Sequence, residues 1–97
     1  MGLLPSFKMS NRRANMELQA GALAQSTLEE LRASPFETLV SSSEPVKKGD
    51  LTFNREIVVT ESSSGLSKVV RVNMTWDWKG QQFRTFRETI FAKAPRP

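Results

Sequence analysis

Two tryptophans and five basic residues near them in the sequence are the candidates for a binding function. Trp76 and Trp78 are two positions apart, so both rings would lie on one face of a β-strand. Basic groups beside aromatic rings can bind single-stranded nucleic acid, because rings stack on bases and cations neutralise phosphates. The residues that would do this are Lys68, Arg71, Trp78, Lys79, Arg84 and Arg87. Two tryptophans on one face of a small domain are more often part of the core, however, and Arg84 and Arg87 would lie on opposite faces of their strand.

Catalytic and metal-binding residue types are scarce. The 97 residues include no Cys and no His, which removes the thiol nucleophile, the usual general base near neutral pH and the commonest metal ligands. The carboxylates are scattered: Glu29 and Glu30 point in different directions on a helix, whereas Asp77 and Glu88 lie on expected strands. The five glycines are isolated, so the sequence has no phosphate-binding loop. We therefore expect no enzymatic activity, no cofactor and no metal site.

Length and charge set broad limits. A chain of 97 residues forms one domain with a modest core. There are 14 Lys and Arg residues against 10 Asp and Glu, a formal net charge of +4, and no block of five like charges, which is ordinary for a soluble domain. No apolar run approaches the roughly 18 residues needed to cross a bilayer. The chain as given is therefore expected to be one soluble domain.

Residues 11–34 are expected to form one long N-terminal amphipathic helix. Ala, Leu, Glu, Gln, Met and Arg dominate this segment, and all of them favour helices. Pro35 disfavours helical geometry in the residue before it, so the helix should end near Ser34. The apolar residues recur at the spacing of one helical stripe, which comprises Met16, Ala20, Leu23, Ala24, Leu28 and Leu31.

The start of this helix is unusual. Arg12 and Arg13 would lie in its first turn, where the helix dipole disfavours cations. They fit better inside a helix that once continued upstream. We interpret residues 1–10 as a disordered leader or an expression remnant that replaces a removed segment, or else as a native disordered terminus.

Strand patterns occupy the second half of the chain. Residues 35–50 are rich in Ser, Pro, Lys and Gly and are expected to form a loop. Alternating apolar and polar residues then predict strands at residues 51–60, 66–78 and 81–93. Lys68 and Val69 interrupt the alternation of the middle strand. Both faces of the last strand alternate equally well, so its inner face stays open at this point.

This order of elements predicts an α+β fold. Residues 11–97 would form a single domain in which the helix packs on an antiparallel sheet of three or four strands. The helix–sheet core is expected to comprise Leu23, Leu28, Leu31, Val70, Val72, Met74 and Trp76.

Two stretches resemble the soluble headgroup of type IV pilin-like proteins, and in particular the minor pilins and the minor pseudopilins of type II secretion. Residues 20–32 are similar to the exposed half of that family's long N-terminal helix. Residues 69–76, a Gly-containing turn and the polar strand at 83–91 are similar to the family's ending, V-x-V-x-W, turn, strand. With the segments between them, the resemblance covers roughly residues 14–93. The family's cleavage site and apolar half-helix have no match here. Removal of that half-helix would leave Arg12 and Arg13 near the start of the remaining helix, where they are found.

The resemblance implies a non-enzymatic structural subunit of a type IV pilus or type II secretion filament that contributes to assembly or priming at the tip. Its partners would be other pilin or pseudopilin subunits. The missing N-terminal helix would anchor it in the bacterial inner membrane, with the headgroup in the periplasm and later in the filament or at the cell surface. The alternative, from the residues alone, is a small basic binding module, for DNA in particular, acting alone or in a DNA-uptake filament.

Overall fold

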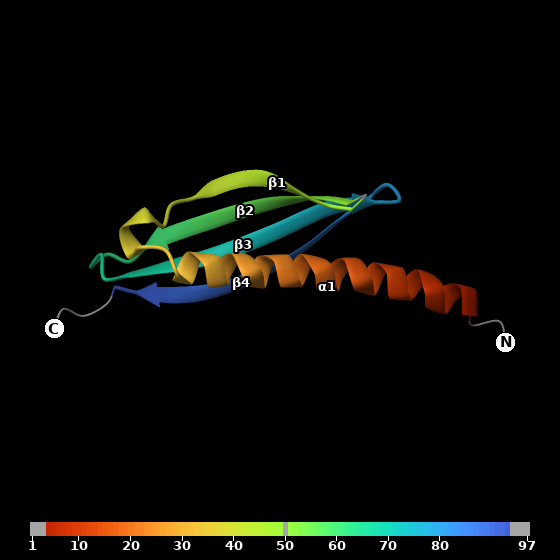
Figure 1. Cartoon of the computed structure of the whole chain (residues 1–97), viewed down its shortest axis with the longest axis horizontal. Coiled ribbons are helices and arrows are strands. Elements are labelled where there is room, and N and C mark those ends of the chain that lie inside the picture. Colours follow the sequence, from red (N-terminus) through yellow and green to blue (C-terminus); the bar gives the residue numbers. More distant parts are fainter. Residues whose placement is uncertain (1–3, 50, 94–97) are drawn as a thin grey trace.

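A computed structural model, which describes residues 4–49 and 51–93 and the side chains from Arg12 onward, has an α+β fold with one helix on a four-stranded antiparallel sheet (Figure 1). Strands that are neighbours in sequence pair with each other, so the sheet order is β1-β2-β3-β4, with β1 and β4 at the edges. Helix α1 covers one face of the sheet, and its first turns extend beyond the end of the sheet (Figure 1). The elements are α1 (Leu4–Arg32), a short 3-10 helix η1 (Phe36–Thr38), β1 (Ser42–Lys48), β2 (Leu51–Glu61), β3 (Ser67–Trp78) and β4 (Gln81–Ala92).

Helix α1 begins earlier than the sequence analysis predicts. Its first residue is Leu4 rather than Asn11, so the expectation of a disordered segment over residues 1–10 is wrong for residues 4–10. Pro5 does not prevent this start, because proline is tolerated in the first turn of a helix, where the amide hydrogens have no intrahelical acceptor. Arg12 therefore lies about two turns inside the helix, where the dipole penalty on a cation is small.

Strand β1 lies in the segment that was expected to be a loop. It pairs with β2 from Ser42, opposite Ile57, to Lys48, opposite Leu51. Serines and Pro45 disfavour a central strand, but β1 is an edge strand, and a proline is acceptable where one side of the backbone needs no partner. The loop expectation is therefore corrected for residues 42–48.

The pairing of β3 with β4 decides which residues face the helix. Burial alternates along β3 without a break up to Trp76, so Lys68 keeps the inward position and is buried, and it does not interrupt the strand. Phe83 of β4 lies opposite Trp76, and residues directly opposite each other share a face. The inner face of β4 therefore carries Phe83, Thr85, Arg87, Thr89 and Phe91, and its outer face carries Arg84, Phe86, Glu88 and Ile90.

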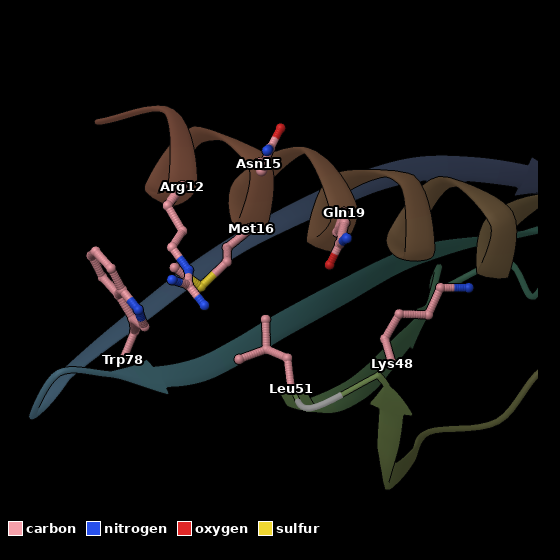
Figure 2. Close-up of a pocket in the computed structure, with 7 residues that line it drawn as sticks. All are labelled: Arg12, Asn15, Met16, Gln19, Lys48, Leu51 and Trp78. Atoms are coloured by element: carbon pink, nitrogen blue, oxygen red, sulfur yellow. The ribbon is translucent and has the colours of Figure 1, made fainter. Parts of the chain in front are cut away.

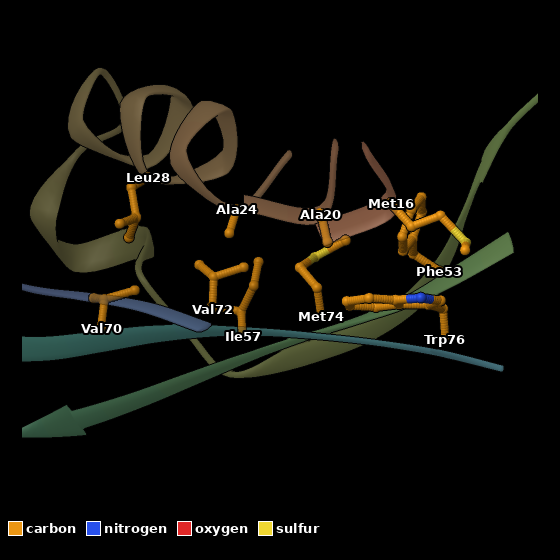
Figure 3. Packing of buried hydrophobic residues seen from close by; sticks show 10 residues of the cluster. All are labelled: Met16, Ala20, Ala24, Leu28, Phe53, Ile57, Val70, Val72, Met74 and Trp76. Carbon is orange, nitrogen blue, oxygen red and sulfur yellow. The ribbon is translucent and has the colours of Figure 1, made fainter. Parts of the chain in front are cut away.

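The core lies between α1 and the inner face of β2 and β3 (Figure 3). Helix α1 contributes a residue at every fourth position, and its two alanines let the helix backbone approach the sheet closely. The buried cluster comprises Met16, Ala20, Ala24, Leu28, Phe53, Ile57, Val70, Val72, Met74 and Trp76. Of the residues expected in the core, Leu23 and Leu31 are only partly buried and pack against the edge of this cluster. The ring of Trp76 meets that of Phe53 edge-on, with 5.5 Å between ring centres.

Candidate functional site

Lys68, one of the six candidate DNA-binding residues, is buried beneath the segment that joins α1 to β1. Its Nζ donates hydrogen bonds to the carbonyl oxygens of Phe36, at 2.9 Å, and Leu39, at 3.2 Å. The same ammonium lies 4.6 Å from the centre of the Phe36 ring. A buried cation needs acceptors, and two backbone carbonyls supply them here. Lys68 therefore holds the connecting segment on the sheet, and only 7% of the residue is exposed.

The three candidate arginines lie on two faces of the sheet. Arg71, on the outer face, forms an ion pair with Glu88 in which Nε lies 3.2 Å from Oε2. Arg84 is exposed on the same face, opposite Thr75. Arg87 lies on the inner face, toward α1. The arginines therefore do not form one continuous basic surface.

Trp78 and Lys79 lie together at the end of the domain where β3 turns into β4. The Nζ of Lys79 is 5.1 Å from the centre of the Trp78 ring, and the rings of Trp78 and Phe83 are 6.2 Å apart. The guanidinium of Arg13 on α1 lies 4.7 Å from the centre of the Phe83 ring. Trp76 is only 3% exposed, so the two tryptophans do not form an open stacking platform.

A groove of about 410 Å³ opens beside Trp78 at this end of the domain (Figure 2). Arg12 and Lys48 are the charged residues among those that line it, and both are cations. The other lining residues are Asn15, Met16, Gln19, Leu51 and Trp78. The groove can therefore bind an anionic group that has an apolar part next to it. The sequence analysis missed it because its residues come from three distant segments.

Basic residues surround the same end of the domain. We call this surface the basic end; it comprises the exposed residues Arg12, Arg13, Lys47, Lys48 and Lys79. Two acidic residues lie near it in the described chain: Glu17, whose Oε1 is 3.5 Å from Nε of Arg13, and Asp77, which precedes Trp78. Asp50 lies outside the described residues. Five cations less these two carboxylates leave a surplus of three positive charges among the described residues.

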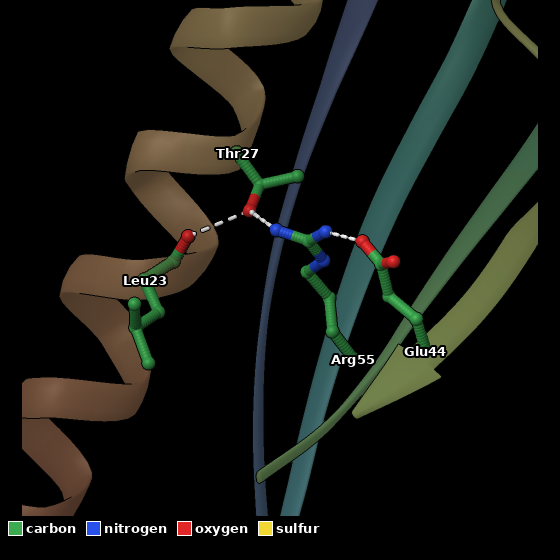
Figure 4. Close-up of polar contacts among 4 residues, drawn as sticks. All are labelled: Leu23, Thr27, Glu44 and Arg55. Carbon is green, nitrogen blue, oxygen red and sulfur yellow. Dashed lines mark hydrogen bonds and ion pairs between the residues drawn. The ribbon is translucent and has the colours of Figure 1, made fainter. Parts of the chain in front are cut away.

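Arg55 joins α1 to the first two strands (Figure 4). Its Nη1 donates to Oγ1 of Thr27 at 3.0 Å, and that hydroxyl donates to the carbonyl oxygen of Leu23 at 2.8 Å. Its Nη2 forms an ion pair with Glu44, which lies opposite Arg55 on β1. An arginine on the inner face of β2 is an exception to the apolar pattern, and these partners explain how it is accommodated. The sequence offered no signal for this network, because Thr27 and Arg55 are 28 residues apart.

Within residues 4–49 and 51–93, no group of three Asp or Glu side chains is placed to hold a metal ion. In the same part of the chain, no helix is both long and apolar enough to span a membrane. No protein-family model matches the chain, and no curated protein or solved structure is significantly similar to it. Function is therefore inferred from the fold and from the chemistry of its surfaces.

Proposed function

We propose that this chain is the headgroup of a type IV pilin-like subunit, a minor pilin or a minor pseudopilin, and that it acts as a structural subunit rather than as an enzyme. The observation that carries the proposal is the placement of α1. The helix packs on an antiparallel sheet with its C-terminal part and extends past the sheet at its N-terminal end (Figure 1). A helix with such an end can continue into an apolar segment that anchors the subunit and later packs in a filament.

The proposal requires that α1 have one side toward the sheet and another toward sister subunits. Met16, Ala20 and Ala24 are buried against the sheet. Leu18 lies between them in sequence and is 70% exposed. A large apolar side chain on the solvent side of a helix suits a contact with a neighbouring helix. In the proposal this side of α1 meets sister subunits.

The outer face of the sheet offers a second contact surface. Phe86 and Ile90 on β4 are 49% and 66% exposed, and Val58 on β2 is 36% exposed. The Arg71–Glu88 ion pair lies between these side chains, and in the proposal this mixed apolar and charged face contacts a sister subunit. The proposed partners are other pilin or pseudopilin subunits at the filament tip. Before assembly, the subunit would be anchored in the inner membrane with this headgroup in the periplasm.

The test is to tag the full-length protein in its own bacterium and to isolate sheared filaments. We expect the tagged protein in the filament fraction, and fewer filaments after deletion of its gene. Leu18→Glu should lower incorporation, because it places a charge on the proposed helix contact. Ser63→Glu is the matched control, since it adds the same charge in the exposed β2–β3 turn. Normal filament numbers in the deletion strain, without tagged protein in wild-type filaments, would reject the proposal.

The isolated 97-residue chain should be monomeric or should self-associate only weakly, because the contacts proposed for it are small surface contacts between headgroups. Light scattering at micromolar concentration measures this directly. A tight homo-oligomer would contradict the proposal.

A small DNA-binding module is the alternative proposal, and it has less support. Lys68 is buried, and the three candidate arginines lie on two faces of the sheet. If DNA binding is the function, affinity should fall about tenfold or more between roughly 50 and 200 mM salt. Lys79→Ala combined with Arg84→Ala should flatten that dependence, and Trp78→Ala should cost about 1–3 kcal/mol if a base stacks on its ring.

A further inference from the structure

We propose that the basic end binds the surface of a bilayer that contains anionic phospholipids, with Trp78 at the level of the lipid headgroups. The inference goes beyond the role of a filament subunit, and its test does not depend on that role.

The cations of the basic end come from three elements that meet at one end of the domain. Arg12 lies on α1, Lys48 ends β1, and Lys79 lies in the turn between β3 and β4. None of these three forms an ion pair with a carboxylate of the described residues. They lie at the end of the sheet past which the first turns of α1 extend (Figure 1), so a bilayer meets the three cations together where those turns lie along it or enter it. Each such cation improves binding to an anionic bilayer about fivefold.

The groove adds an apolar component beside these charges (Figure 2). Met16, Leu51 and Trp78 line it together with Arg12 and Lys48. A phospholipid presents both features, because its anionic phosphate is joined through glycerol to apolar acyl chains. Tryptophan favours this depth in a bilayer, since its ring is apolar and its N–H remains near water.

Nucleic acid fits this surface less well. A single strand needs a basic track that follows its backbone, and rings that are free to stack on bases. At the basic end, Lys79 lies over the ring of Trp78, and Arg13 lies over that of Phe83. The cations lie around one end of the sheet and do not form a row along which a single strand could run.

The first experiment compares vesicle binding by the wild-type chain and by a basic-end variant that carries Arg12→Gln, Lys48→Gln and Lys79→Gln. Vesicles with roughly one third phosphatidylglycerol in phosphatidylcholine should bind the wild type, and the variant should bind about 100-fold less well because three cations are lost. Pure phosphatidylcholine vesicles should bind both proteins weakly. Circular dichroism establishes that the variant keeps its fold. Equal binding of the wild type to both kinds of vesicle would overturn the proposal.

A matched control removes three exposed cations elsewhere on the domain, by Arg32→Gln, Arg87→Gln and Lys93→Gln. It has the same net charge as the basic-end variant and should bind anionic vesicles within about threefold of the wild type, because its cations lie away from the surface. An equal loss in both variants would show that binding follows net charge and would overturn the proposal. Equally strong binding of single-stranded DNA, lost in the basic-end variant, would overturn it in favour of nucleic acid. Complete inhibition of vesicle binding by free glycerol phosphate would overturn the proposal in favour of a site for a single phosphate group.

A second readout places Trp78 at the bilayer. Lipids with brominated acyl chains quench a tryptophan that enters the interface. Quenching should disappear in Trp78→Phe and persist in Trp76→Phe, because Trp76 is only 3% exposed. Persistent quenching in Trp78→Phe would overturn the proposed orientation. Absence of vesicle binding together with normal incorporation into filaments would reject this inference alone, and the reverse outcome would reject the subunit role alone.

Discussion

Gly21 tests how closely α1 packs on β4. It is buried in the middle of the helix, and a Cβ at this position would lie 2.6 Å from Nη2 of Arg87 and 3.4 Å from its Cζ. Ordinary contact between such atoms is about 3.5 Å, so the guanidinium would have to move by about 1 Å. The obstacle is the end of a flexible side chain, and the sheet backbone is not part of it.

We expect Gly21→Ala by itself to change the free energy of unfolding by less than about 0.5 kcal/mol. Alanine should stabilise the helix by about 1 kcal/mol relative to glycine. Moving the guanidinium offsets this gain, because Nη1 of Arg87 donates a 3.0 Å hydrogen bond to the carbonyl oxygen of Phe86 that is worth about 0.5–1 kcal/mol. In an Arg87→Ala background the obstacle is absent, and Gly21→Ala should stabilise the domain by the full 1 kcal/mol or so.

Urea unfolding of the four proteins in this double-mutant cycle measures the coupling. In a thermal scan, 1 kcal/mol corresponds to a Tm shift of about 4–8 °C for a domain of this size. Ala22→Gly is the matched control, since Ala22 is exposed on the same helix. This substitution should lower the free energy of unfolding by about 1 kcal/mol with or without Arg87. The reasoning fails if Gly21→Ala shows the full gain in the presence of Arg87. It also fails if the substitution costs more than about 2 kcal/mol in both backgrounds, because the obstacle would then be something other than Arg87.

Substitutions at three further positions test the core by the same unfolding measurement. Leu28→Ala should lower the free energy of unfolding by about 2–5 kcal/mol, because a 3%-exposed leucine leaves a cavity, and a loss under about 1 kcal/mol would place Leu28 outside the core. Lys68→Met should cost about 1–3 kcal/mol and speed amide exchange at Leu39, because it keeps the aliphatic stem but leaves the carbonyls of Phe36 and Leu39 without their donor. Unchanged stability and exchange would contradict this account. Trp76→Phe should cost less than about 1.5 kcal/mol and Trp76→Ala about 3–5 kcal/mol, because the indole N–H meets no acceptor in the described part of the chain. A loss of unfolding free energy in Trp76→Phe as large as that in Trp76→Ala would contradict the absence of a hydrogen bond from the indole N–H.

The surfaces of this domain combine residues that are far apart in sequence, and this limits what sequence patterns can predict about function. The six candidate DNA-binding residues are close in sequence, but Lys68 is buried and Arg87 faces the helix. The groove beside Trp78 needs residues from α1, the β1–β2 hairpin and β3. Local periodicity carries no information about contacts between distant segments. It therefore grouped candidate DNA-binding residues that the fold separates, and it did not indicate the groove residues that the fold brings together.

The α+β class could be predicted from local sequence patterns, because the chain contains both a helical and a strand periodicity. Apolar residues recur at helical spacing up to Leu28, and residues of β3 alternate up to Trp76, so each segment has one apolar face that must be covered by the other. The structure confirms one helix on a four-stranded antiparallel sheet.

The start of α1, the existence of β1 and the inner face of β4 could not be predicted from local patterns and follow from packing and strand pairing. At Pro5 and Pro45 the local preference of the residue is overridden by its position, since a first helical turn and an edge strand both tolerate a missing amide hydrogen. On β4 both faces alternate equally, and the choice follows from pairing with β3, which places Phe83 beside Trp76. The physical reason is common to all three: burial and pairing energies depend on which distant segment lies next to a residue, and a local pattern does not contain that information.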